Sequence, residues 1–295
     1  MRYLAIVSMI WIAACDGSPA DISSPTPIFP DLEKPGAFNR MYTFTENQEG
    51  TLRVWTQEQG DATWLYESRK RNDGNWSDPV QLNAFPNQGM LTEPSFSAYD
   101  GYLYYASNAV LPSRGKGQDP NIWRVEPTKN GWGTPEPLSH AINTGAAELG
   151  PVMDREGRLY FTTDFKRGRF GHDVVEAHWD EATEDWIVQP MPDAFNSFRA
   201  DAQIGITPDG NRIFFYSHRT PKVGFVDIWT AQRDSEGNWQ APENMGEPVN
   251  TPGPDLGPSV SLDGETFYFS RDGQLMQMPL HQALSGVGWT GAETD

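Results

Sequence analysis

Apolar and polar residues alternate in short runs along most of the chain, and pairs of runs are joined by an acidic residue and a glycine. Four such pairs resemble one another closely: TEPSFSAYDGYLYYAS (92–107), LGPVMDREGRLYFTT (149–163), AQIGITPDGNRIFFYS (202–217) and LGPSVSLDGETFYFS (256–270). A period of two is typical of strands with one buried face, and Asp-Gly supplies the positive φ that short hairpin turns require. The pattern therefore predicts the same antiparallel hairpin four times, with a degenerate fifth copy at Glu49-Gly50.

A tryptophan that follows Asn, Gly or Asp marks the same period. It recurs every 50 to 56 residues, at Trp76, Trp132, Trp186, Trp239 and Trp289. A proline follows the first four tryptophans after three or four positions, at Pro79, Pro135, Pro190 and Pro242. Such a period is typical of propellers and other repeat architectures, whereas a β-sandwich explains neither the even spacing nor the constant offset from Trp to Pro.

Each unit contains four predicted strands. The hairpin supplies two, a longer loop leads to a third such as DIWTAQ (227–232), and a polar turn leads to the tryptophan segment. Proline is confined to sheet edges, so the segment from Trp to Pro is expected to be outermost, with its ring against the neighbouring blade. The units predict an all-β fold, a five-bladed β-propeller of four-stranded antiparallel blades, over residues 38–295. They begin and end in phase, so the closure of the ring stays open, with a strand from Ile28-Phe29 as one alternative.

The units SLDGETFYFS, TPDGNRIFFYS and VDIWTAQRDSEGNWQAP are similar to the WD-repeat-like propellers of the TolB and tricorn-protease type. The shared signature is Pro-Asp-Gly, an aromatic strand and then Asp-Ile-Trp, which Asp227-Ile228-Trp229 matches in full. Asn121-Ile122-Trp123 and Asp173-Val174-Val175 depart from it. The resemblance covers nearly the whole chain after its N-terminal segment and implies a propeller that serves for binding or scaffolding.

The first residues have the form of a secretion signal, with one arginine, about a dozen apolar residues and small residues before the single cysteine. Ile12-Ala13-Ala14-Cys15 resembles the bacterial lipobox, which implies cleavage before Cys15 and acylation of that residue. The expected organisation is a lipoprotein signal peptide (1–14), a lipidated cysteine with a Pro- and Ser-rich tether (15–37), and the propeller (38–295). Asp16 resembles an inner-membrane retention signal, so a lipid-anchored, periplasmic location in the bacterial cell envelope is predicted.

Acidic residues outnumber basic ones by 40 to 22, which gives a formal net charge of −18. A surface of this sign repels phosphate backbones, so nucleic acid is not expected as a partner. The expected partner is a protein or another envelope component, and the lipid on Cys15 is the expected link to the membrane.

Alignment of the units on their turns reveals a second regularity. An acid precedes the acidic turn residue by seven or eight positions and is expected to start the innermost strand, so that four carboxylates ring one mouth of the channel: Glu93, Glu148, Asp201 and Asp255. The loops after the second strands end on the same face and carry basic residues, among them Arg114, Arg167, His218, Arg219 and Arg271. In a structural interpretation, the acids cap loop backbone or pair with neighbouring arginines. In a functional interpretation, these residues form an axial rim that binds a partner or ligand.

No sequence motif specifies a reaction. Gly-x-Ser-x-Gly, His-Glu-x-x-His and Walker motifs are absent, and the five histidines lack ligand spacing. No cofactor is predicted, and a calcium ion among the axial acids is an alternative that the residue types leave open. The main prediction is a non-catalytic binding or scaffolding protein. The alternative is a carbohydrate-active propeller, hydrolase or lectin-like, because glycoside hydrolysis needs two carboxylates at a defined separation and the acidic ring contains candidates.

Overall fold

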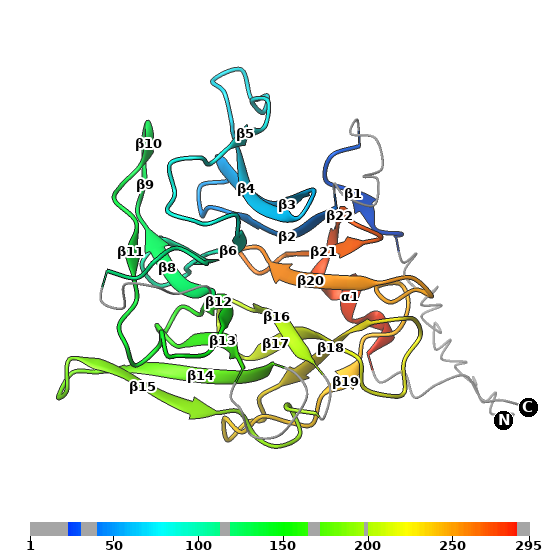
Figure 1. Cartoon of the computed structure of the whole chain (residues 1–295). Helices are drawn as coiled ribbons and strands as arrows, with labels where there is room; N and C mark the ends of the chain where they lie inside the picture. Colours follow the sequence, from blue (N-terminus) through cyan, green and yellow to red (C-terminus); the bar gives the residue numbers. More distant parts are fainter. Residues whose placement is uncertain (1–22, 31–39, 113–118, 165–171, 198–199, 288–295) are drawn as a thin grey trace, which may run out of the picture.

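Five four-stranded antiparallel sheets are arranged radially as the blades of a five-bladed β-propeller (Figure 1). The computed structural model describes residues 23–30, 40–112, 119–164, 172–197 and 200–287. The fold predicted from the repeat is therefore confirmed. Some residues singled out above lie outside the described ranges, so their assigned roles stay predictions: Cys15, Asp16, Arg114, Arg167 and Trp289.

Four blades follow the chain from the axis outward. Blade 1 contains β2 (Met41–Glu46), β3 (Leu52–Gln59), β4 (Ala62–Arg69) and β5 (Val80–Gln81). Blade 2 contains β6 (Leu91–Phe96), β7 (Leu103–Ser107), β8 (Asn121–Val125) and β11 (Glu136–Pro137). Blade 3 contains β12 (Glu148–Met153), β13 (Leu159–Thr163), β14 (Asp173–Asp180) and β15 (Asp185–Pro190). Blade 4 contains β16 (Asp201–Ile206), β17 (Arg212–Ser217), β18 (Asp227–Gln232) and β19 (Glu243–Asn244).

Blade 5 combines both ends of the chain. It contains β20 (Asp255–Val260), β21 (Thr266–Arg271), β22 (Gln274–Pro279) and, outermost, β1 (Thr26–Pro27). The remaining elements are the hairpin β9 (Pro127–Thr128) and β10 (Gly131–Trp132), the helix α1 (Leu280–Ala283) and the 3-10 helix η1 (Leu284–Gly286). No helix in the described part of the chain is long and apolar enough to span a membrane.

The first strands of the blades surround the axis, and each packs against the first strands of both neighbouring blades, β2–β6–β12–β16–β20 (Figure 1). Each of these strands has a β-bulge, at which the third residue of the strand has a positive φ: Thr43, Glu93, Gly150, Gln203 and Gly257. A bulge bends a strand and redirects a side chain. Four of these positive-φ residues, all except Gly257, line a small cavity at the channel.

The five predicted turns join the first and second strands, and their glycines have φ values between 62° and 82°. In blade 4, Asp209 Oδ1 accepts hydrogen bonds from the Thr207 hydroxyl at 2.6 Å and the Asn211 N–H at 3.1 Å. We term the side of the propeller that carries these turns the turn face. The side on which the first strands begin is termed the rim face.

The four tryptophan segments within the described residues lie at the periphery as predicted. The outermost strands β5, β11 and β19 directly follow the proline of each segment, and β15 contains both Trp186 and Pro190. Trp132 packs against blade 1, where its Nε1 donates to Glu67 Oε2 at 2.8 Å. Trp239 lies 4.1 Å from the Arg233 guanidinium carbon and contacts Tyr160 of blade 3. These rings thus join neighbouring blades.

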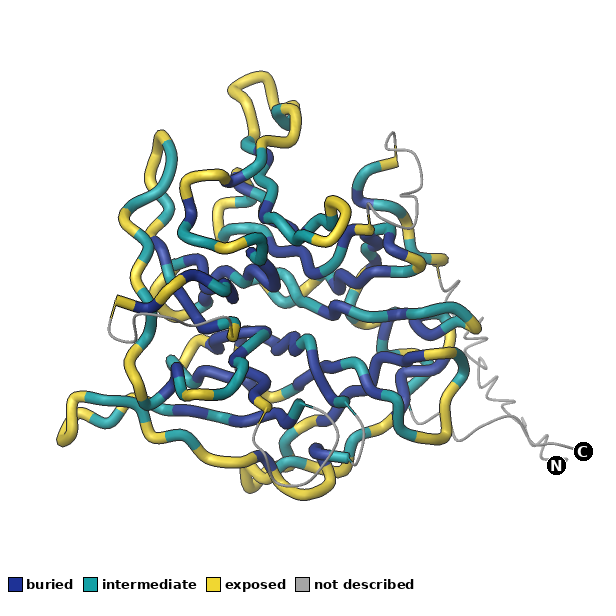
Figure 2. The backbone as a smooth tube through the Cα atoms, viewed as in Figure 1, coloured by how far each residue is buried: buried dark blue, intermediate teal, exposed yellow. Residues whose placement is uncertain are grey.

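The ring closes through the N-terminal strand β1. Thr26 pairs with Gln277, and the Ile28 N–H donates to the Leu275 carbonyl at 2.9 Å. Ile28 is buried in a cluster with side chains of blades 1 and 5, among them Phe44. The propeller thus includes residues of the segment 15–37 that the sequence predicted as a tether. Apolar clusters fill the spaces between blades, and Figure 2 shows the buried residues along the central strands and the exposed ones in peripheral loops.

Candidate functional site

Asp201, at the start of β16, is fully buried and is held by an arginine of the same blade. Arg219 Nη2 donates to Asp201 Oδ1 at 2.8 Å, and the Ser197 N–H donates to Asp201 Oδ2 at 2.6 Å. Arg219 also donates to the carbonyl oxygens of Ala194 and Phe195. Both charged groups therefore tie the loop before β16 to the loop after β17.

The same arrangement recurs in blade 5. Arg271 Nε donates to Asp255 Oδ1 at 2.9 Å, while the N–H and hydroxyl of Thr251 donate to Asp255 Oδ2 at 2.6 and 2.7 Å. Arg271 Nη2 also donates to the carbonyl oxygens of Pro248 and Val249 at 2.8 Å. Burial raises the pKa of Asp255, against the opposing effect of Arg271 and Thr251.

Glu148 starts β12 and is also fully buried, where it accepts hydrogen bonds from the Thr144 N–H at 3.1 Å and from the Thr144 hydroxyl. These three acids thus bind the loop before their own strand, which is the kind of contact that the structural interpretation describes. The binding role of the axial rim stays a prediction. His218 lies edge-on to Phe225 on the rim face, with ring centroids 5.5 Å apart and Phe225 67% exposed.

Glu93 does not occupy its expected position. Leu91 starts β6, and Glu93 is the third residue of the strand, at the bulge. The prediction that an acid begins the innermost strand is therefore wrong for blade 2. The turn from Ser97 to Gly101 is one residue longer than the corresponding turns, so the equivalent position lies nine residues before Asp100, at Leu91, where the chain has no acid.

Glu93 is the acid that faces the channel. Its carboxyl group lies beside Gln203 and Gly150, and burial raises its pKa to about 7. The cavity that it lines has a volume of about 20 Å³, and no second carboxylate of the described residues lines it. A cavity of this size holds about one water molecule. The channel at this level therefore admits neither a sugar ring nor a peptide.

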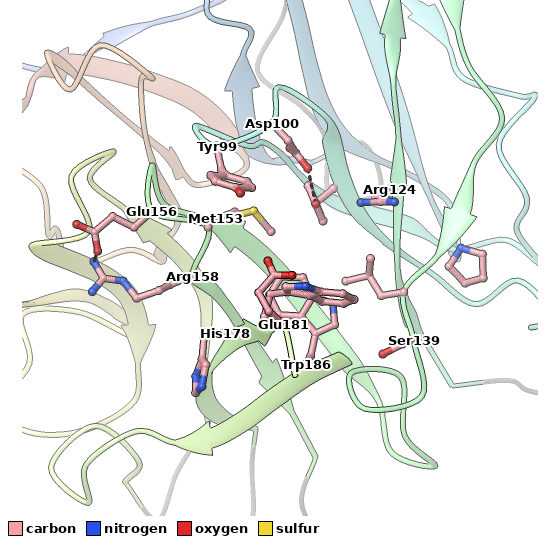
Figure 3. Close-up of a pocket in the computed structure, with 15 residues that line it drawn as sticks. Tyr99, Asp100, Arg124, Ser139, Met153, Glu156, Arg158, His178, Glu181 and Trp186 are labelled. Atoms are coloured by element: carbon pink, nitrogen blue, oxygen red, sulfur yellow. Dashed lines mark hydrogen bonds and ion pairs between the residues drawn. The ribbon is translucent and has the colours of Figure 1, made fainter. Parts of the chain in front are cut away.

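A much larger cavity, of about 640 Å³, opens between blades 2 and 3 on the turn face (Figure 3). We term it the interblade groove. The turn of blade 2 and β8 form one wall, and the turn of blade 3 with the β14–β15 hairpin forms the other. Its lining residues include Tyr99, Asp100 and Arg124 from blade 2, and Trp179, Glu181 and Trp186 from blade 3.

Aromatic rings stand on both walls of the groove. Tyr99 is 65% exposed, and its ring lies against Gly157, where an added Cβ would come within 3.4 Å of the ring. Trp179 is 44% exposed and packs edge-on against Trp186, with centroids 5.8 Å apart. Exposed aromatic faces opposite one another suit ligands with flat or cationic groups.

Charged side chains complete the lining. Arg158 Nε lies 2.7 Å from Asp154 Oδ2, and its Nη2 lies 3.2 Å from Glu156 Oε2, as Figure 3 shows for the second pair. Asp100 Oδ2 accepts a hydrogen bond from the Tyr104 hydroxyl at 2.9 Å. The groove thus combines apolar rings with polar groups in fixed positions, which is typical of ligand sites.

Sequence reasoning missed this groove because it searched for what the units share. Tyr99 lies in the lengthened turn of blade 2, and Trp179 and Glu181 lie in the hairpin of blade 3 that is longer than its counterparts. Both walls are therefore departures from the repeat. A comparison of unit lengths was the signal that could have found them.

Sequence reasoning also missed a set of asparagines that stabilise the third strands of the blades. Asn250 Oδ1 accepts the Ile228 N–H at 2.8 Å, and its Nδ2 donates to the Ile228 carbonyl at 2.9 Å. Asn143 and Asn196 hold the third strands of blades 2 and 3 in the same way. Among the described residues, no group of three or more His, Cys, Asp or Glu side chains is placed to hold a metal ion.

The sequence matches no protein-family model and none of the curated proteins. A putative TolB from Agrobacterium tumefaciens is 15% identical over 84% of this chain and 79% of that chain, with a TM-score of 0.52. An endo-arabinase from Bacteroides thetaiotaomicron VPI-5482 is 14% identical over 87% of this chain and 97% of that chain, with a TM-score of 0.53. A TolB from Acinetobacter baumannii is 13% identical over 82% of this chain, which spans 54% of that protein, with a TM-score of 0.48. At these identities, the first two likenesses show only that the chain shares its β-propeller fold with the putative TolB and with the endo-arabinase.

Proposed function

We propose that this chain is a lipid-anchored binding protein of the bacterial cell envelope, which holds a protein partner in the interblade groove. The observation that carries the proposal is the groove itself, with exposed rings on both walls. Aromatic side chains in such positions are enriched among the residues that dominate protein binding energy. The TolB-type likeness supports a propeller used for binding, at the level of fold.

The contacts at the axis disfavour glycoside hydrolysis there. Asp201 and Asp255 are buried and each is engaged by an arginine and by backbone donors. A hydrolase of glycosides uses two carboxylates that flank the scissile bond, and the small axial cavity offers Glu93 as its carboxylate among the described residues. The alternative, a carbohydrate-active propeller, is favoured by the carboxylates Asp100, Glu156 and Glu181 beside the rings of the groove.

The anchoring part of the proposal rests on Cys15 and the lipobox-like residues before it. Labelled palmitate is expected to be incorporated into the wild type and not into a Cys15→Ser variant, since the acyl chain is attached to this cysteine. Equal incorporation into both proteins would contradict lipid anchoring through this residue.

The groove is tested by site-specific photo-crosslinking in intact cells. A photoreactive amino acid at Tyr99 probes the groove, and the same amino acid at Phe225 probes the rim face, where the ring is similarly exposed. We expect one discrete crosslinked protein from Tyr99 that a Trp179→Ala substitution weakens. Crosslinks from Phe225 and none from Tyr99 would move the binding site to the axial rim. Crosslinks from neither position, with binding of oligosaccharide by the purified chain, would favour the carbohydrate alternative.

A further inference from the structure

The interblade groove continues across the turn of blade 2 into a second cavity. This cavity, of about 240 Å³, lies between blades 1 and 2 on the turn face, and Glu49, Tyr102 and Glu126 contribute to its lining. Asp100 lines both cavities. Together they form one path over three neighbouring blades, which we term the turn-face track. A path that runs through two cavities on either side of a turn suits an extended chain better than a compact ligand.

Aromatic rings are distributed along the track. Tyr99 and Trp179 are exposed in the groove, and Tyr102 lies in the second cavity. The faces of such rings attract cations placed over them. The chain uses this interaction itself, because the Arg124 guanidinium carbon lies 5.1 Å from the centroid of Tyr102.

The arginines of the track are already paired, whereas four of its carboxylates make no ion pair within the described residues: Glu49, Asp100, Glu126 and Glu181. Arg124 pairs with Glu136 at 3.4 Å, and Arg158 pairs with Asp154 and Glu156. Glu126 and Glu181 are exposed and make no ion pair within the described residues. The track is therefore acidic toward a ligand, and the formal net charge of −18 strengthens the attraction for a cation.

We propose that the turn-face track binds an extended peptide segment rich in lysine and arginine, contributed by the protein partner. This inference rests on the proposed function and names the chemistry of the partner. The cationic groups lie over Tyr99 and Trp179 and pair with Asp100, Glu126 and Glu181, while the peptide backbone crosses the turn of blade 2. Charge-assisted pairs beside aromatic faces give such a segment both affinity and register.

The test uses the full chain in detergent and three labelled probes. They are a peptide of alternating lysine and serine, its glutamate-containing counterpart, and a neutral oligosaccharide of linked glucose units. We expect the lysine peptide alone to bind, with affinity that falls as sodium chloride is raised. The E126Q/E181Q double variant is expected to weaken binding by about tenfold, the sum of two partly exposed charge pairs.

A double variant of exposed acids outside the track, E236Q/E247Q, is the matched control because it removes the same charge. If both double variants bind the lysine peptide equally weakly, the effect is a general attraction to the net negative charge of the protein, and the proposal is overturned. Equal binding of the glutamate peptide, or tighter binding of the oligosaccharide, would also overturn it. If the lysine peptide fails to bind while crosslinks still form at Tyr99, the ligand class is wrong and the proposed function stands. If both fail, the proposed function falls with it.

Discussion

Replacement of Glu93 by glutamine removes one ionisable group from the middle of the propeller with little change in shape. The carboxyl group is buried at the axis beside Gln203 and Gly150. Glutamine has nearly the same size and shape at this position, but it does not ionise. The variant therefore isolates the cost of ionising a carboxyl group at this position.

The size of the effect follows from the pKa of Glu93, which burial raises from 4.5 to about 7. Between these two pH values the folded protein binds more protons at this site than the unfolded chain does, so stability falls as pH rises. The contribution of the protonated group is fully present below pH 4.5 and is lost above about pH 7. A difference of two to three pKa units corresponds to about 3 kcal/mol.

The assay is urea denaturation of the wild type and the Glu93→Gln variant from pH 4.5 to pH 8, followed by tryptophan fluorescence. The free energy of unfolding of the wild type, minus that of the variant, is expected to fall by about 3 kcal/mol across this range. A Glu247→Gln variant controls for the loss of one carboxylate at an exposed position. If this difference in the free energy of unfolding is constant with pH, or rises with pH, Glu93 is not a buried neutral carboxyl group in the folded protein.

Two further predictions concern stability. Arg219→Ala is expected to lower the free energy of unfolding by about 3–5 kcal/mol, because it leaves the Asp201 carboxylate buried without its cation. Adding Asp201→Asn is expected to restore part of this loss in thermal denaturation, and equal stability of the wild type and Arg219→Ala would contradict a structural role of the pair. Ile28→Ala is expected to cost about 2–5 kcal/mol, because Ile28 is buried where β1 closes the ring; an unchanged melting temperature would show that closure contributes little to stability.

Alignment of the repeat units predicted some of the candidate site residues and missed others. Alignment of the turns found Asp201 and Asp255 correctly at the starts of β16 and β20. Arg219 lies in the loop after β17 as predicted, whereas Arg271, predicted in the loop after β21, is the last residue of that strand, and each pairs with the acid of its blade. The same alignment misplaced Glu93, because the longer turn puts the first residue of β6 nine positions before Asp100, at Leu91, and Glu93 is only seven positions before it. Residues that recur in every unit are those that every blade needs to fold. The groove residues lie where units differ, so a search for recurrence passed over them.

The blade number, the hairpins and the peripheral position of the tryptophan segments were determined by the sequence alone, because they depend on local periodicity and on backbone preferences of glycine and proline. The pairing of Thr26 with Gln277 was decided by tertiary structure, since it exists only when five blades complete a circle. The same is true of the groove, whose walls come from Tyr99 and Trp179, far apart in the chain. Local patterns specify strands and turns, whereas contacts between blades depend on the angle and spacing at which whole sheets pack.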